Sequence, residues 1–337
     1  MKCFHLFDRH RSLLVLAVVA GALATVASMA APSFAAVVSF GSGPNQFNME
    51  FVTIGNPNNA ANTTVAPIPA GAVGYTYGIG KFEVSEDMIT KFNASQSLQI
   101  TKDTRGAAKP ATMVSWNEAA RFVNWLNTST GAFAAYNFTT SGVDDNITVW
   151  TTADTLDYDA ANPYRSKRAT YVLPSSNEWY KAAYYSPSNS TYYNFTNGSD
   201  TAPTAVASGT AAGTAVYSQP YAQGPADVDQ AGGLSPYGVM GLGGNVFEWE
   251  ESSFDSANSS HSSVRGFRGG SWRDGNSFFL SSSGRDGVSP SGVNDNIGFR
   301  VVSLSSSAPP AVPEPSMMVI GTLFGLGGLM AKRRMKK

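Results

Sequence analysis

The stretch Gly241–Gly275, GLGGNVFEWEESSFDSANSSHSSVRGFRGGSWRDG, decides how the rest of the chain is interpreted. It contains a Gly-Gly-Asn turn, two tryptophans, a run of acidic residues and an Arg-Gly-Gly-Ser-Trp turn. Glycine-rich turns that carry large aromatic side chains indicate tight backbone geometry around something buried or bound. We therefore expect both the fold and any functional site to be organised around this stretch.

The N-terminal end, residues 1–35, has the pattern of a secretory signal peptide. Basic residues come first, an uncharged apolar run covers 13–27, and Ser-Phe-Ala at 33–35 fits a cleavage site. The mature chain is predicted to begin at Ala36 or Val37. The alternative is an uncleaved membrane anchor, which the short apolar run and the cleavage site disfavour.

The C-terminal end carries a second targeting pattern. The triplet Pro313, Glu314 and Pro315 precedes an apolar run over 317–331, and a basic hexapeptide ends the chain. The run is short for a membrane span of roughly 20 residues, and the basic end favours a cytoplasmic location. This order predicts a short stop-transfer segment that holds an exported protein at the inner membrane.

The order of these three elements resembles the PEP-CTERM sorting signal of Gram-negative bacteria, over residues 312–337. The resemblance implies an exosortase-type processing enzyme as partner and transient residence in the inner membrane. It also implies a final location at the cell surface or in the extracellular matrix. Residues 304–311, rich in Ser, Pro and Ala, are predicted to be the linker to this segment.

Charge and cysteine content exclude several functions. Without the three basic residues and one acid of the leader, and the five basic residues and one acid of the tail, 15 basic and 22 acidic residues remain. Such an acidic balance argues against nucleic acid as a partner. The only cysteine of the chain is Cys3, inside the leader. A mature protein without cysteine forms no disulfide, thiolate nucleophile or cysteine metal site.

The remaining chain predicts short strands, three helices and long loops. Ser85 is expected to cap the first helix, and Ser115 with Glu118 and Ser175 with Glu178 form capping boxes. Strands are expected over 37–54, 75–84 and 171–174, and helices over 86–93, 116–127 and 177–185. Loops are expected over 56–72 and 186–236, and a hairpin or an insertion over 128–168.

Five blocks carry a resemblance to a known family. They are GKFEVS at 80–85, the stretch 110–126, LPSSNEW at 173–179, GNVFEW at 244–249 and RGGSW at 268–272. In this order they resemble the formylglycine-generating enzyme, or sulfatase-modifying factor, family over residues 37–303. The resemblance implies a single loop-rich α+β domain, a variant of the C-type lectin-like fold.

The family oxidase binds copper and activates oxygen through two cysteines, and the resemblance places Asp274 and Phe279 at those positions. Neither residue supplies the soft thiolate that Cu(I) requires, so copper and oxidase chemistry are not expected. The iron-dependent branch needs a histidine cluster, whereas the mature chain has only His261. We interpret His261 as a surface residue, and no Gly-x-Ser-x-Gly turn accompanies it for a serine hydrolase.

The resemblance also implies a calcium site. The family places Ca²⁺ on the backbone oxygens matching Gly244 and Val246 and on the carboxylate matching Glu248. It also uses an Asn or Asp side chain where this chain has Gly241. Hard oxygen ligands on a tight turn suit Ca²⁺. Calcium is therefore kept as a candidate cofactor, with one ligand missing.

The other charged residues of the stretch allow two interpretations. Glu250, Glu251 and Asp255 could contribute to glycosidase chemistry with a second carboxylate, but solvated acids beside a metal ligand are preferred. The arginines near the Gly and Trp turns are expected to be buried and paired rather than to bind a ligand. They are Arg265, Arg268, Arg285 and Arg300.

The prediction for function is an exported, non-catalytic binding module. Its ligand groove is expected to be lined by Trp272, Arg273, Asp274 and Arg285, with a glycan or a protein of the extracellular matrix as ligand. The face of a tryptophan ring suits the apolar face of a sugar. Two alternatives remain: the family's oxidase activity, and a structural matrix component without a specific ligand.

Overall fold

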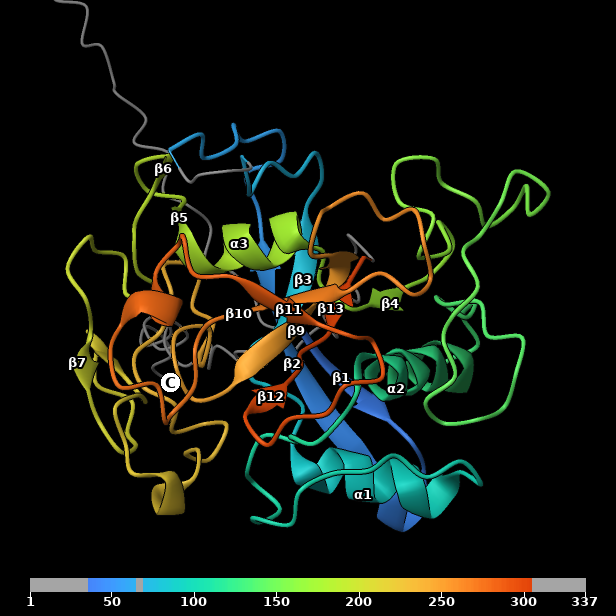
Figure 1. Cartoon of the computed structure of the whole chain (residues 1–337), viewed down its shortest axis with the longest axis horizontal. Coiled ribbons are helices and arrows are strands. Elements are labelled where there is room, and N and C mark those ends of the chain that lie inside the picture. The colour runs from blue at the N-terminus through green and yellow to red at the C-terminus, as the bar shows by residue number, and fades with distance from the viewer. Residues whose placement is uncertain (1–35, 65–68, 305–337) are drawn as a thin grey trace, which may run out of the picture. The chain divides into compact units, whose positions relative to one another are not determined.

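The computed structural model describes residues 36–64 and 69–304, which belong to one structural unit. The described chain combines three α-helices with short strands and long connecting loops, as the α+β prediction stated (Figure 1). The helices are α1 (Glu86–Ser95), α2 (Trp116–Ser129) and α3 (Ser176–Tyr184), with 3₁₀ turns η1 (Gly43–Asn45), η2 (Tyr221–Gln223) and η3 (Phe278–Leu280).

Two sheets contain most of the strands. The first has the order β1-β2-β3-β13-β4 and is antiparallel throughout; the second has the order β11-β10-β9-β12, in which β12 pairs in parallel with β9. Their strands are β1 (Ala36–Phe40), β2 (Phe47–Ile54), β3 (Tyr77–Gly80), β4 (Tyr171–Val172), β9 (Phe247–Ser253), β10 (Arg265–Arg268), β11 (Asp286–Val288), β12 (Ile297–Gly298) and β13 (Val302–Ser303). Two minor pairs complete the set: β5 (Tyr185–Ser186) with β6 (Thr191–Tyr192), and β7 (Thr204–Ala205) with β8 (Thr214–Ala215).

The predicted helix starts are confirmed. The side chain of Ser85 accepts a hydrogen bond from the backbone of α1. Ser115 with Glu118 and Ser175 with Glu178 form complete capping boxes at α2 and α3. Each box satisfies backbone groups that the first turn of a helix leaves without partners. Local sequence therefore fixes where α2 and α3 begin, and with them the positions of the side chains in their first turns.

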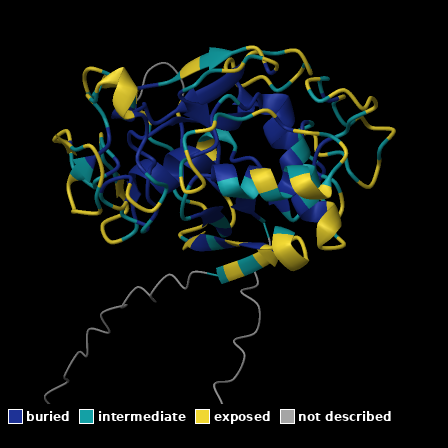
Figure 2. Ribbon diagram, turned by 90° about the horizontal axis from the view of Figure 1, so that it is seen from below, coloured by how far each residue is buried: buried dark blue, intermediate teal, exposed yellow. Residues whose placement is uncertain are grey.

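Strand β9 lies at the centre of the packing, because three tryptophans connect it to the helices. The indole of Trp116, the first residue of α2, donates to the carbonyl of Glu250 at 2.9 Å. The indole of Trp179 in α3 donates to the carboxylate of Glu248 at 2.7 Å. Trp249 of β9 itself donates to the carbonyl of Val114 at 3.0 Å. All three rings are fully buried, and Figure 2 shows buried residues in the interior with the exposed ones on the outer loops and the outer faces of helices and strands.

The apolar face predicted for the second helix is also confirmed. Its six members, Trp116, Ala119, Ala120, Phe122, Val123 and Leu126, have no exposed surface. Phe122 makes an edge-to-face contact with Phe299, near the end of the chain, with ring centroids 5.7 Å apart. The helix therefore joins the first half of the chain to the block that closes the domain.

One strand is shorter than expected. The alternation over 75–84 predicted a strand of that length, but β3 ends at Gly80. Beyond it the chain turns inward, and the side chain of Glu83 is buried. Val84 then bonds through its backbone nitrogen to the carbonyl of Phe299 at 2.9 Å. The alternation of apolar and polar residues therefore continues beyond Gly80, where the hydrogen-bonded pairing of the strand ends.

The predicted leader, the sorting segment at 312–337 and the processing triplet Pro313–Pro315 lie outside the described residues. Within the part of the chain that the structure describes, no helix has both the length and the apolar character that a membrane crossing requires.

Candidate functional site

Strand β9 carries three glutamates, and all three are buried. Glu248, Glu250 and Glu251 have no exposed surface. The expectation that the acids around Glu248 are solvated was wrong for Glu250 and Glu251. A buried carboxylate is costly unless a cation and hydrogen bonds compensate it, and each of these three has an arginine partner. These ion pairs determine which side chains remain open to a ligand.

Glu248 does not fit the calcium site that the resemblance implied. Arg300 donates to both carboxylate oxygens, with Nε 2.5 Å from Oε2, and Trp179 donates to the same Oε2. Its negative charge is therefore already neutralised by a buried cation. Gly244 and Val246 are buried in the same turn, but without a free carboxylate they offer a calcium ion only neutral oxygens, which is a weak donor set.

Gly241 adds a second reason against calcium. It has φ +77°, and a Cβ built on it would lie 2.4 Å from Oε1 of Glu83. The Glu83 carboxylate therefore fills the place where the family carries an Asn or Asp side chain. Oε1 accepts from Asn245 at 2.8 Å, while Oε2 is buried without a partner among the described residues. Burial raises the pKa of Glu83 to about 7, against the opposing effect of Arg300.

The two positions at which the resemblance placed the copper-binding cysteines of the family hold residues without a thiol. Asp274 accepts from the backbone nitrogen of Ser271 at 2.6 Å and from its hydroxyl at 3.0 Å. Phe279 packs edge-to-face on Phe247, with centroids 5.3 Å apart. Burial raises the pKa of Asp274, but a carboxylate and a phenyl ring are not ligands for soft Cu(I). The residues present do not fit copper.

The predicted groove around this turn needs correction at Trp272. Its ring has no exposed surface and packs with Val216, Ala226 and Val246, so no sugar can stack on it. The guanidinium of Arg105 lies 4.8 Å from the ring centroid. Trp272 is therefore a core residue beneath the surface.

The remaining groove residues separate into two places. Arg273 stays at the turn, where it pairs with Asp295 at 2.9 Å beside the exposed ring of Tyr221. Arg285 lines a different pocket, whose walls include neither Arg273 nor Asp274. The structure therefore does not bring the four predicted residues together.

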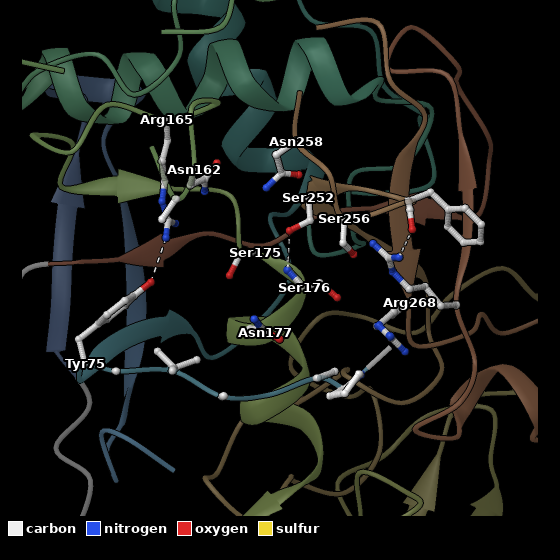
Figure 3. A pocket seen from close by; sticks show the side chains of 18 of the residues that line it. Tyr75, Asn162, Arg165, Ser175, Ser176, Asn177, Ser252, Ser256, Asn258 and Arg268 are labelled. Carbon is white, nitrogen blue, oxygen red and sulfur yellow. Dashed lines mark hydrogen bonds between the residues drawn. The ribbon is translucent and has the colours of Figure 1, made fainter. Parts of the chain in front are cut away.

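That pocket is the better candidate site. It has a volume of about 540 Å³, within the range of small-molecule sites, roughly 300–1,000 Å³. Six separate parts of the chain supply its walls: 69–75, 159–165, the start of α3, the end of β9 with the loop to 258, Arg268 at the end of β10, and 283–285. Figure 3 shows Tyr75 and Arg165 on one side, Arg268 on the other, and Ser175, Ser176 and Asn177 between them.

The arginines of the pocket are held by buried glutamates. Arg268 and Arg285 each place Nε 2.8 Å from one oxygen of Glu250. Burial acts to raise the pKa of Glu250, but the two arginines lower it below the usual value. The prediction that these arginines are buried and paired is confirmed for Arg268 and Arg300, whereas Arg285 is paired but only partly buried.

The opposite wall repeats this arrangement. Arg165 donates to both oxygens of Glu178, at 3.0 and 3.2 Å, and to the hydroxyl of Tyr75 at 2.9 Å. The pKa of Glu178 is lowered, because Arg165 outweighs the effect of burial. Glu251 lies behind it and accepts from Tyr136 at 2.8 Å and from Asn162. Burial raises the pKa of Glu251, against the opposing effect of Arg165.

Arg265 and His261 also lie away from the pocket walls. Arg265 is buried as expected, but it forms no ion pair with a carboxylate among the described residues, so the expected pairing was wrong for it. Its guanidinium lies 4.1 Å from the ring centroid of Trp116 and 3.8 Å from that of Tyr164. A cation between two aromatic faces is compensated by their quadrupoles. His261 is exposed, as predicted. Its backbone carbonyl, not its ring, accepts from Arg265 at 3.2 Å.

Sequence reasoning missed most of the pocket. Tyr75, Arg165, Asn177 and Phe254 were not singled out, because each comes from a different part of the chain. One signal was available: the second capping box fixes the start of α3 and so places Asn177 in the first turn of that helix. Nothing in the spacing of the other three indicates that they meet.

Solved structures resemble this fold at low sequence identity. Treponema denticola variable protein 1 is 20% identical, with a TM-score of 0.54, over 79% of this chain and 98% of that one. CarF is 18% identical, with a TM-score of 0.48, over 76% of this chain and 98% of its own. PvdO from Pseudomonas aeruginosa is 18% identical, also with a TM-score of 0.48, over 80% and 98%. No curated protein sequence matches the chain.

The family resemblance rests on the order of five blocks, and a comparison with family profiles agrees with it. The profile described as a sulfatase-modifying factor enzyme 1-like domain matches residues 45–304, which is most of the chain. Blocks, fold and profile lead to the same conclusion: this chain belongs to the FGE-sulfatase family.

Proposed function

We propose that this member of the FGE-sulfatase family is a non-catalytic binding module. The observation that supports it most is the state of the two copper positions. Asp274 is bonded to its own turn and Phe279 is packed on Phe247, so neither position offers a thiolate that could bind Cu(I) or act as a nucleophile. The same domain keeps a polar pocket elsewhere. A fold that has lost its metal ligands but retains a built pocket is better suited to binding than to oxidation.

The proposed ligand is a glycan or a protein of the extracellular matrix, and the proposed location is the surface of a Gram-negative cell. The leader at 1–35 and the triplet Pro313–Pro315 support export and processing by an exosortase-type enzyme. Calcium is not part of the proposal, because Arg300 already neutralises Glu248. Copper is not part of the proposal either, because a carboxylate and a phenyl ring are not ligands for soft Cu(I).

Two assays on the purified full-length chain test the proposal. The first adds copper and a cysteine-containing sulfatase peptide, with an active family oxidase as positive control; no formylglycine should form. The second screens the chain against glycan and peptide arrays, where saturable binding is expected. Peptide turnover would restore the oxidase interpretation. Absence of binding on both arrays would favour a structural matrix component instead.

A further inference from the structure

The charges in the pocket wall cancel almost completely. Arg165, Arg268 and Arg285 face three buried carboxylates, those of Glu178, Glu250 and Glu251. The lining adds one more charge, the exposed carboxylate of Asp159. The pocket therefore has no excess positive charge to attract an acidic ligand.

The donors of these arginines are also largely used. Arg165 bonds through both terminal nitrogens to Glu178 and Tyr75. Arg285 bonds through its terminal nitrogens to the carbonyls of Ser253 and Phe254. A bidentate clamp on a carboxylate or sulfate needs two free parallel donors. Neither of these two arginines offers them within the described residues, and Arg268 uses its Nε on Glu250 and its Nη1 on the carbonyls of Ser282 and Gly284.

Neutral donors remain open instead. Asn177 uses its Oδ1 to accept from the backbone of Gly71 at 2.9 Å, and Asn258 uses its Oδ1 to accept from the backbone of Ser253, also at 2.9 Å. The amide nitrogens of both residues and the hydroxyl of Ser256 form no hydrogen bond to any described residue. All three side chains line the pocket (Figure 3). Fixed amides and hydroxyls of this kind suit the hydroxyl groups of a sugar.

Two aromatic rings lie at the rim. Tyr75 is 41% exposed and Phe254 is 42% exposed, and both line the pocket. Half-exposed rings above polar groups offer an apolar face to the C–H side of a sugar ring. They replace Trp272, which is buried and cannot stack on a ligand.

We infer that this pocket binds an uncharged saccharide without calcium, held by the amides of Asn177 and Asn258 and by the rings of Tyr75 and Phe254. This inference rests on the proposed binding function and adds to it the class of the ligand and the pocket in which the ligand binds. Because the wall is charge-compensated, binding is expected to change little with salt concentration.

A pair of glycine substitutions tests the location. Gly74 lies on the pocket wall, and a Cβ there meets only Oδ1 of Asn58, at 3.6 Å. Gly275 follows Asp274 at the other candidate place, and a Cβ there meets nothing within 4 Å. Neither glycine has a left-handed backbone, so both accept a side chain without strain. Gly74→Phe narrows the pocket, while Gly275→Phe is the matched control at the turn.

The measurement uses the full-length chain on an array of neutral and acidic glycans, with and without chelator and at two salt concentrations. Neutral glycans should bind in all conditions. Gly74→Phe should weaken that binding by about tenfold or more, equivalent to roughly 1.4 kcal/mol. Phe254→Ala should weaken it as well, Phe254→Tyr should restore it, and Gly275→Phe should leave it unchanged. Equal melting temperatures of the variants confirm that the fold is intact.

Four results would overturn the inference. If only acidic glycans bind, and binding depends on salt, the proposed ligand class is wrong. If Gly275→Phe loses binding and Gly74→Phe does not, the proposed location is wrong. Both results leave the binding function itself in place. Loss of neutral-glycan binding with chelator contradicts the calcium-free site. If no glycan binds, the inference fails, and the proposed function then depends on the peptide array.

Discussion

The turn at Ser271–Asp274 and the pocket beside α3 differ in how they are built. At the turn, the left-handed backbone positions are glycines, Gly269 and Gly270, and Asp274 bonds within its own turn. At the pocket, the left-handed positions in the loop after β9 are Ser256 and Asn258, residues with side chains. The turn thus has glycine where its backbone is left-handed and bonds its aspartate locally, whereas the pocket has residues with a Cβ at left-handed positions and leaves some side-chain donors open. A conspicuous sequence motif therefore marks the fold here, and a less conspicuous set of residues forms the candidate site.

Breaking the ion pairs under the pocket should have the largest effect. Glu250→Gln removes the charge that Arg268 and Arg285 share, leaving two buried cations with one neutral acceptor. We expect a loss of about 3–5 kcal/mol in the free energy of unfolding. Asp274→Asn at the turn is the matched change; it keeps an acceptor for Ser271 and should cost about 1 kcal/mol. Denaturant unfolding at pH 7 measures both. Equal losses would mean that the pocket is no more dependent on charge than the turn.

The buried glutamates should also respond to pH with opposite signs, according to the direction in which the pKa of each is shifted. Glu83 accepts a hydrogen bond from Asn245, near the start of the Gly241–Gly275 stretch. Burial raises its pKa to about 7, from an ordinary value of 4.5. Between these values the folded state binds more protons than the unfolded state, so stability falls as pH rises through this window, by at most roughly 1.4 kcal/mol per pH unit. The pKa values of Glu178 and Glu250 are lowered, so their contribution is present above pH 4.5 and is lost as pH falls below it.

The variant Glu83→Gln isolates the first of these effects. Glutamine keeps an acceptor for Asn245 and does not titrate. Unfolding experiments from pH 4.5 to 8 should show that the decline between pH 4.5 and 7 disappears in the variant. A decline of the same size in both proteins would assign it to other groups.

Whether the sequence could predict a feature of the fold or of the site depends on how far apart along the chain the interacting residues lie. The capping serines and the apolar face of α2 were predictable, because their partners lie within a few residues. The pairing of Arg300 with Glu248 was predictable only as a class, since burial and composition indicate that an arginine is paired but not with which acid. The pocket was not predictable, because Tyr75, Arg165 and Asn177 meet only through tertiary structure.

A smaller effect is expected at Trp272, where stability and binding should separate. Trp272→Phe keeps most of the buried ring and removes an indole N–H that has no partner among the described residues. The altered shape should cost about 1–2 kcal/mol in the free energy of unfolding, and ligand binding should not change. Denaturant unfolding and the glycan array are the two measurements. A clear loss of affinity with little loss of stability would return the ligand to the turn.

The smallest effect should be a gain in stability. Ser256 has φ +61°, a left-handed conformation that costs a residue with a Cβ about 1–2 kcal/mol relative to glycine. Glycine is also more flexible in the unfolded chain, which offsets part of the benefit, so Ser256→Gly should stabilise the protein by up to about 1 kcal/mol. For a domain of this size the melting temperature should then rise by about 2–4 °C.

The effect of Ser256→Gly on ligand binding is the informative measurement, because Ser256 lines the pocket and its hydroxyl forms no hydrogen bond within the described part of the chain. If the serine is retained for the ligand, Ser256→Gly should become more stable and bind more weakly. Gly269 at the turn already has the residue that its backbone prefers, so Gly269→Ala should only destabilise, its Cβ lying 2.9 Å from the carbonyl oxygen of Leu242. A Ser256→Gly protein that gains stability and binds as well as the parent would show that the strained loop serves the fold alone. The difference between turn and pocket would then be one of packing rather than of function.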